Sequence, residues 1–290
     1  MHATPGATAR RGRTTRVLKR IIVAYDGSDD AREAFAYALM LAKASGVTIV
    51  GLHAMEPGVP PAVLADPMVG YDVGPALAMQ HEQIEAERAA SKEALAELGE
   101  ECVRRDIRYV ERMSTGRLID VLTDEASASD IIAVGRKGRF VRSGFGSSTR
   151  ALIERSPCPV LIVSGPMRPL VRLLAVYDSS SESKRAVAFA EDLSTATGWP
   201  MSILAAAGHG HTLDEALQRA GENWPDAAII SLSEDEQRNE GRLIEHAAST
   251  NGYSLLVMGA YSESWLHKLF FGGATEHVLA SVGAPVVLVH

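Results

Sequence analysis

The chain has 290 residues, of which 46% are hydrophobic and 22% charged, and its formal net charge is −7. This composition is typical of a globular protein, and at about 150 residues per domain the length predicts two domains. The acidic balance argues against a general nucleic-acid-binding protein, and no apolar run reaches the ~18 residues of a membrane-spanning helix. We therefore expect neither nucleic acid nor membrane as a partner.

The N-terminal residues and the cysteines both bear on where the protein resides. Residues 1–16 contain four arginines, and the apolar segment that follows is short and interrupted by Lys19 and Arg20. Such a segment does not suit a signal peptide, so we expect a disordered basic tail over 1–16, with a nucleic-acid or membrane arm as the alternative. Cys102 and Cys158 form neither a disulfide framework nor a zinc motif. A reducing compartment fits them best, and we expect a cytoplasmic protein.

Short apolar runs alternate with helical patterns in the first half of the chain. The run from Arg20 to Asp26 precedes an apolar stripe at helical spacing that stops at Gly46, a common terminator of helices. A stretch rich in proline and glycine over 57–75 predicts a loop. The further strands expected here are 47–54, 107–113, 131–135 and 160–163, and the further helices are 76–105, 118–128 and 147–155. Helix 76–105 is expected to bury Leu77, Ile84, Leu95, Leu98 and Cys102.

The second half repeats this order of elements. The run RIIVAYD at 20–26 returns as RLLAVYD at 172–178, and the fourth and fifth strands also have matching runs. Three matched blocks in the same order predict a duplicated domain. The second copy is about 28 residues shorter between its first and fourth strands. Its expected strands are 172–178, 201–207, 227–232, 254–259 and 285–289, with a short helix near 213–220.

Apolar strands that alternate with amphipathic helices predict parallel sheets covered on both faces. We therefore expect an α/β protein with two tandem Rossmann-like domains, each a five-stranded parallel sheet flanked by helices. Domain 1 is expected over 17–164 and domain 2 over 170–290, with a linker at 165–169. The two fifth strands are edge candidates. Pairing within the chain would give an intramolecular pseudo-dimer without these exposed edges, and a homodimer stays open.

In open parallel sheets, ligands bind beyond the carboxyl ends of the strands, where the strand order reverses. Asp26 ends the first strand there, and a loop reading GRKGRFVRSGFGSST follows the fourth strand from Gly135. Its glycines let backbone N–H groups approach an anion, and Ser147 and Ser148 stand at a helix N-terminus, which favours phosphate. Asp26 can accept hydrogen bonds from a ribose hydroxyl or an adenine amine. The same loop carries the cations Arg136, Lys137, Arg139 and Arg142.

Each of these features has a simpler interpretation when taken singly. A glycine-rich loop can be a turn, a cluster of cations can be a solvated surface, and Asp26 can cap the following helix. Their convergence at one edge of one sheet favours a phosphate-bearing ligand over these alternatives.

The motif Gly135-x2-Gly138-x7-Gly146-Ser147 resembles the signature of the universal stress protein family, Gly-x2-Gly-x9-Gly-(Ser/Thr). The resemblance includes Asp26 and the closing strand, and it extends over roughly residues 17–290 as two family domains in tandem. The spacer is two residues shorter than the family pattern, which leaves the phosphate register open. The resemblance implies an adenine nucleotide alpha hydrolase-like fold and a link to stress responses. Some members of the family bind ATP and others do not, and for this chain we expect ATP as ligand, with or without Mg²⁺.

The resemblance also implies contacts by position. Asp26 would meet the ribose and adenine region, and the backbone of Ala54 would line the adenine pocket. The implied ribose and phosphate contacts are Gly135, Arg136 and Gly138. The implied contacts of the phosphate tail are Gly146, Ser147 and Ser148.

The loop of the second copy departs from this pattern. Ser262 replaces the second glycine, Gly273 replaces the phosphate-facing serine, and Glu263 would repel phosphate. A non-glycine residue in a left-handed conformation costs roughly 1–2 kcal/mol. We expect weak or no ATP binding in this half, which would rather have a structural or partner-binding role.

The sequence does not favour a catalyst. It has no Walker-type loop and no obvious general base with an orienting partner near the glycine loop. His209 and His211 could join a metal site but lack an evident third ligand, and His53 is expected to pack at its strand end. We therefore expect a non-catalytic protein that ATP regulates by shifting a conformational population, with an unknown protein partner. A nucleotide-independent scaffold and a slow ATPase are the alternatives.

Overall fold

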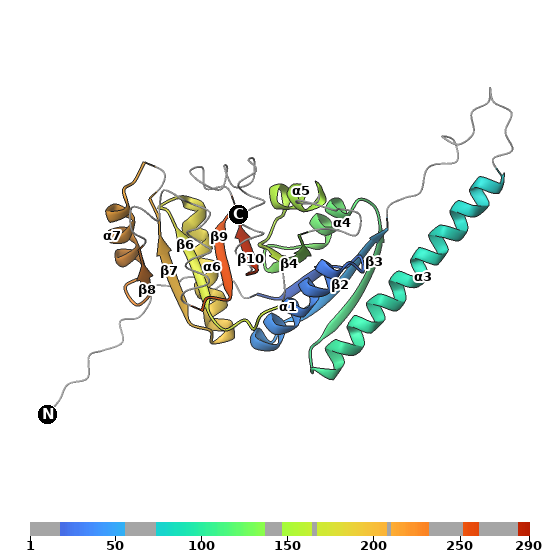
Figure 1. Cartoon of the computed structure of the whole chain (residues 1–290), viewed down its shortest axis with the longest axis horizontal. Helices are drawn as coiled ribbons and strands as arrows, with labels where there is room; N and C mark the ends of the chain where they lie inside the picture. Colours follow the sequence, from blue (N-terminus) through green and yellow to red (C-terminus); the bar gives the residue numbers. More distant parts are fainter. Residues whose placement is uncertain are drawn as a thin grey trace, which may run out of the picture.

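The structure, a computed structural model, describes residues 18–55, 74–136, 147–163, 167–207, 210–231, 252–260 and 284–290. The side chains of 74–77 and 147–150 are not described. The basic tail expected over 1–16 and the expected loop as far as residue 73 lie outside these residues. The described elements form an α/β protein with helices packed against a large sheet (Figure 1). None of the described helices combines the length and hydropathy needed to cross a membrane.

The elements follow the predicted order, with bounds within a few residues of expectation. The first half contains β1 (Arg20–Ala24), α1 (Asp29–Ser45), β2 (Thr48–Met55), α3 (Gly74–Arg104), β3 (Tyr109–Thr115), α4 (Leu118–Glu125), β4 (Asp130–Gly135), α5 (Ser147–Arg155) and β5 (Val160–Val163). The second half contains β6 (Leu173–Tyr177), α6 (Ser181–Thr197), β7 (Met201–Ala205), α7 (Leu213–Asn223), β8 (Ala228–Ile230), β9 (Leu255–Gly259) and β10 (Val286–Val289).

Local signals fix both ends of the first helix in each half. The hydroxyl of Ser28 accepts the N–H of Ala31 at the start of α1, and Gly46 ends this helix at φ 71°. Ser180 and Gly198 occupy the same places around α6, where Gly198 has φ 74°. A serine N-cap and a left-handed glycine satisfy backbone groups that a helix leaves unpaired, so these residues determine where the helices begin and end.

The described strands form one ten-stranded sheet in the order β3-β2-β1-β4-β5-β10-β9-β6-β7-β8. Within each half the pairings are parallel, and the order is that of a Rossmann-like domain. Strands β5 and β10 pair antiparallel, with Val287 opposite Leu161. The expected pairing of the fifth strands is therefore present, and it joins two five-stranded sheets into one.

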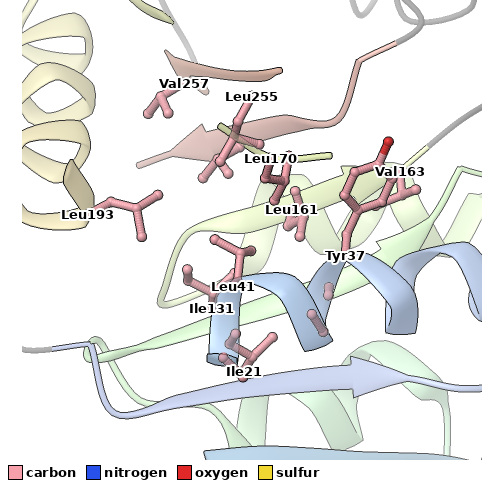
Figure 2. Close-up of a cluster of buried hydrophobic side chains, with 14 of the residues drawn as sticks. Ile21, Tyr37, Leu41, Ile131, Leu161, Val163, Leu170, Leu193, Leu255 and Val257 are labelled. Atoms are coloured by element: carbon pink, nitrogen blue, oxygen red, sulfur yellow. The ribbon is translucent and has the colours of Figure 1, made fainter. Parts of the chain in front are cut away.

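Both faces of the sheet are buried. Ile21 and Val23 of β1 belong to one core cluster, and Ile22 and Ala24 belong to the cluster on the opposite face. The first cluster also includes residues of α1 and α6, which contact each other, so it runs across both halves. Figure 2 shows part of this cluster, with Leu41 from α1 among residues of both halves.

The segment between the halves also packs against this core. Leu170 is buried in the shared cluster, and the N–H of Arg168 donates to the Tyr37 hydroxyl of α1 at 3.0 Å. The two halves thus share a sheet, a core and a docked connection.

Helix α3 is longer than its packing surface. Leu95, Leu98 and Cys102 are buried as predicted, whereas Ile84 is half-buried and the side chain of Leu77 is not described. The N-terminal part of α3 extends beyond the body of the protein (Figure 1), and most side chains between residues 78 and 93 are therefore exposed. The C-terminal part packs on β2 and β3.

Tyr109 of β3 fixes the packed part of α3. Its hydroxyl donates to the carbonyl of Leu95 at 2.8 Å. Gly51 and Gly99 make room for the ring: a Cβ on Gly51 would collide with it, and one on Gly99 would lie 3.0 Å from Cδ1. Two glycines and one tyrosine therefore set how closely α3 approaches β2.

Candidate functional site

The strand order of the first half reverses between β1 and β4. These strands lie side by side, with Val23 opposite Ala133. The residues that follow them, Asp26 after β1 and Arg136 after β4, consequently lie at the same carboxyl edge. The structure thus brings the end of the first strand and the start of the glycine loop together, as the sequence predicts.

Asp26 shapes the turn into α1. Its Oδ1 accepts the N–H of Ser28 at 3.0 Å, and Ser28 in turn caps the helix. Gly27 between them has φ 75°, a left-handed conformation that glycine adopts without strain. The side chain is half-buried. Asp26 therefore has a structural role in the turn.

Gly135 owes its identity to packing against α1. A Cβ at this position would lie 2.5 Å from the Cβ of Asp30 and 2.7 Å from its carbonyl carbon. No larger residue fits unless β4 or the first turn of α1 moves. The close approach brings the N-terminus of α1 next to the start of the glycine loop.

Arg136, the residue after Gly135, has a partly buried guanidinium group, which is unusual for an arginine. Its backbone N–H donates to the carbonyl of Val163 at 2.9 Å, which holds it beside β5. Its side-chain Nε is buried and has no hydrogen-bond partner among the residues that the structure describes. An orphaned buried donor is costly unless a partner satisfies it, so this N–H is suited to an anionic ligand.

The remaining predicted site residues are only partly described. Helix α5 begins at Ser147, as predicted, but the side chains of Ser147 and Ser148 are not described. Gly138 and Gly146 lie outside the described residues, together with the cations Lys137, Arg139 and Arg142. Ala54 is half-buried near the carboxyl end of β2, where it pairs with Ser114.

A polar arrangement beside Ala54 was missed by sequence reasoning. Nδ1 of His53 lies 2.7 Å from the carbonyl oxygen of Tyr25, and Nε2 lies 3.0 Å from the hydroxyl of Ser91. His53 does lie near the end of its strand, as expected, and in addition it joins β1 to α3. The available signal was Ser91, a small polar residue one heptad from Ile84 on the apolar stripe of α3.

Tyr25 and the two cysteines have side chains whose pKa is raised in this half. Burial raises the pKa of the Tyr25 phenol, while the positive charge of Arg32 opposes the shift. Burial also raises the pKa of Cys102 and of Cys158 to about 11. Both thiols are buried and free, so they are protonated and unreactive at neutral pH.

The second half has the same edge with different residues. Asp178 is 1% exposed and accepts both the N–H and the hydroxyl of Ser180, at 3.0 and 2.5 Å. Ser179 occupies the place of Gly27 and has φ 70°. Gly259 packs as Gly135 does, since a Cβ there would lie 2.6 Å from that of Glu182.

The other predictions for this half are only partly accessible. Ser262, Glu263, Gly273 and His209 lie outside the described residues. His211 contacts Glu215 at 3.2 Å and Arg219 at 3.1 Å. In the described residues, no three histidine, cysteine, aspartate or glutamate side chains gather as a metal site would require.

The chain is similar over most of its length to proteins of one family. A model of the universal stress protein family matches residues 18–164 and again residues 171–290. Universal stress protein Slr1230 of Synechocystis sp. is 24% identical over 291 residues, which cover 93% of this chain and 99% of that protein. A universal stress protein of Thermus aquaticus is 34% identical over 149 residues, or 51% of this chain and 99% of its own.

The fold has a counterpart among solved structures. A universal stress protein of Archaeoglobus fulgidus matches with a TM-score of 0.65 at 17% sequence identity. The match covers 94% of this chain and 97% of that one. It therefore concerns the arrangement of both halves.

Proposed function

The chain belongs to the universal stress protein family as a tandem member, and from this premise we propose that its first domain binds ATP and regulates a stress response through that nucleotide. The observation that carries the proposal is the buried Nε of Arg136, which has no hydrogen-bond partner in the described part of the chain. This donor lies at the point where the strand order reverses, at the same edge as Asp26. A phosphate or ribose oxygen would satisfy it.

We expect the residues at this edge to hold a nucleotide in one orientation, with the base near β2 and the phosphates along the glycine loop. Asp26 would accept from the ribose or the adenine, and the backbone of Ala54 would border the base. Gly135, Arg136 and Gly138 would contact the ribose and first phosphates, and Gly146, Ser147 and Ser148 would contact the tail at the N-terminus of α5. Mg²⁺, if present, would be held mainly by the phosphates and would offset their charge.

The proposed regulation is a population shift. Asp26 shapes the turn into α1 and Gly135 packs against Asp30 of the same helix. A nucleotide that prefers one arrangement of this turn would stabilise that arrangement in α1, which contacts α6. An unidentified protein partner would read the change.

The proposal includes the organisation of the chain. We assign domain 1 to residues 17–164, a linker to 165–169 and domain 2 to 170–290. The pairing of β5 with β10 would make the molecule an intramolecular pseudo-dimer, with homodimer formation through other surfaces as an open outcome. The two buried free thiols support a cytoplasmic location.

The test is native mass spectrometry of the purified chain, followed by calorimetric titration with ATP, ADP, AMP and cAMP. We expect one ATP per chain. Arg136→Ala should weaken binding about tenfold or more, since hydrogen bonds to charged groups contribute about 1.5–3 kcal/mol. Gly138→Ala should also weaken it. Arg112→Ala is the matched control, because Arg112 lies on the edge strand β3 and its side chain is 50% exposed.

Other outcomes favour the alternatives. Two ATP per chain would show that the second loop also binds. No adenine nucleotide at millimolar concentration would overturn the proposal in favour of a scaffold. Phosphate release well above the background would identify a slow ATPase.

A further inference from the structure

Three elements of the first half meet in one hydrogen-bonded chain. Ser91 of α3 lies 3.0 Å from Nε2 of His53 on β2, and Nδ1 of His53 lies 2.7 Å from the carbonyl oxygen of Tyr25, directly after β1. Both distances are within the normal range of hydrogen bonds. The chain lies outside the residues assigned above to the nucleotide.

The carbonyl of Tyr25 fixes the tautomer of the ring. A carbonyl oxygen can only accept, so Nδ1 of His53 carries the hydrogen and donates it. In the neutral ring Nε2 then has a lone pair, to which the hydroxyl of Ser91 donates. A hydroxyl bonded to a neutral imidazole whose other nitrogen is oriented by a third group is the arrangement of an activated nucleophile and its general base.

This arrangement is specific to the first half. Ala205 is the position equivalent to His53, because β2 pairs with β1 in the same register as β7 pairs with β6, and the short helix α7 stands in place of α3. There the carbonyl of Tyr177 accepts the backbone N–H of Ala206 at 2.9 Å instead. The repeated fold therefore does not require the contact between histidine and serine.

The surroundings of Ser91 favour an uncharged substrate. Ser91 is half-buried, and Leu95 of the following turn is buried. The preceding turn of α3 carries Glu87 and Arg88, whose charges cancel. Lys92 and Glu93 beside Ser91 also cancel, so the described residues of α3 place no excess of positive charge there for a phosphate ester, and an acyl ester does not need one.

We propose that Ser91 is a nucleophile towards acyl esters, with His53 as its general base and Tyr25 as the residue that positions His53. Ser91 Oγ would attack the ester carbonyl carbon while its proton passes to Nε2 of His53. The bond from that carbon to the alkoxy oxygen would then break, and His53 would return the proton to the leaving alcohol. The product is an acyl ester on Ser91, and water would later release the carboxylic acid.

Acylation should be faster than release. Ser91 lies within α3, where the backbone N–H groups are bonded along the helix and cannot stabilise an oxyanion. Slow catalysis of both steps leaves the acyl form to accumulate when the ester has a good leaving group. We therefore expect a burst rather than rapid turnover. The esterase activity does not depend on nucleotide binding.

The experiment is stopped-flow hydrolysis of p-nitrophenyl acetate by the full chain, followed by peptide mapping of the acetylated protein. We expect a burst approaching one nitrophenolate per chain, with the acetyl group on Ser91. Ser91→Ala should abolish the burst, and Ser91→Cys should retain it. His53→Gln should slow it about a hundredfold or more, the usual contribution of a general base.

Ser45→Ala is the matched control and should leave the burst unchanged, since the Ser45 hydroxyl donates to the carbonyl of Leu41 and contacts no histidine in the described residues. Circular dichroism establishes that each variant folds. If Ser91→Ala does not fold, the mapped acetyl position in the wild type decides. An acetyl group on His53 or a lysine, a burst that survives Ser91→Ala, or no burst in the wild type would overturn the proposal.

Discussion

The carboxyl edges of the two halves share one backbone plan and differ in accessibility. In the first half Asp26 is half-buried and is followed by Gly27, whereas Asp178 in the second half is 1% exposed and is followed by Ser179. Both aspartates accept from the serine two residues on, and in both halves that serine is the N-cap of the following helix. The common features therefore build the turn, and only the differing ones can explain a difference in ligand binding.

The opposite edges of the two halves also differ. In the first half Arg20 donates to Asp130 through Nε at 3.1 Å and Nη2 at 2.7 Å, and through Nη1 to Glu125 at 2.9 Å. At the equivalent place in the second half, Ser254 accepts the backbone N–H groups of Val171 and Arg172 at 2.7 and 3.0 Å. An ion pair and a neutral hydroxyl thus perform the same task of fixing the start of a strand.

The largest expected effect tests whether the ion pair at Asp130 and the hydroxyl of Ser254 contribute equally to stability. Asp130→Ala should lower the free energy of unfolding by about 3 kcal/mol, because it removes a buried carboxylate that accepts from Arg20 and from the backbone N–H of Ser127, and leaves Arg20 with Glu125 alone. Ser254→Ala should cost about 1–2 kcal/mol, since it removes one hydroxyl acceptor. Urea unfolding of the full chain measures both values. Equal losses in the two variants would contradict the distinction.

The pH dependence of stability provides a control for this prediction. Burial alone would raise the pKa of Asp130, but hydrogen bonds from Arg20 and Ser127 outweigh burial and hold the pKa below its ordinary value. A lowered pKa stabilises the fold above the unfolded value of about 3.9, and this contribution disappears as the pH falls through the folded value. Asp130→Asn should therefore flatten the stability curve below about pH 4.

A second change should affect both halves alike. Gly135→Ala and Gly259→Ala should each destabilise the protein by about 1–3 kcal/mol, because the new Cβ overlaps the first turn of α1 or α6. Thermal unfolding of the two variants measures the loss. A cost limited to one of them would show that the two first turns are not packed equivalently.

The smallest effect is expected when the residues that follow the two aspartates are exchanged. Ser179→Gly should stabilise by about 0.5 kcal/mol, since it relieves left-handed strain but also gives the unfolded chain more freedom. Gly27→Ser should destabilise by a similar amount. Differential scanning calorimetry at matched concentration resolves such shifts. Stabilisation by both changes would show that the turns differ in more than this residue.

The sequence predicts those features that depend on neighbouring residues. Gly46 marks the end of α1 as the sequence predicts, and the repeated run ending in Asp178 reveals the duplication, whereas the residue that caps α1 is Ser28 and not Asp26, the cap that the sequence offered. Long-range contacts leave no such local pattern. Arg20 and Asp130 are 110 residues apart, and Ser91 and His53 are 38 apart, so the sequence alone does not show that they meet.

The same distinction between local patterns and long-range contacts applies to the candidate site. Residue type and spacing were sufficient to place Asp26 and Gly135 at one edge of the sheet, because strand ends in a parallel sheet have a common side. The collision that excludes a side chain at Gly135 comes from Asp30 on another element. Its packing role could not be inferred from a glycine-rich motif that also suits phosphate.

The antiparallel pairing of β5 with β10 makes assembly independent of how much protein a cell contains. Two separate domains that meet through these strands would dissociate on dilution, whereas here the partner is always supplied by the same chain at a fixed, high effective concentration. Each molecule also contains one copy of each half, so a substitution alters one side of the pair and leaves the other intact. This asymmetry allows the edge at Asp178 to differ from the edge at Asp26 within one molecule.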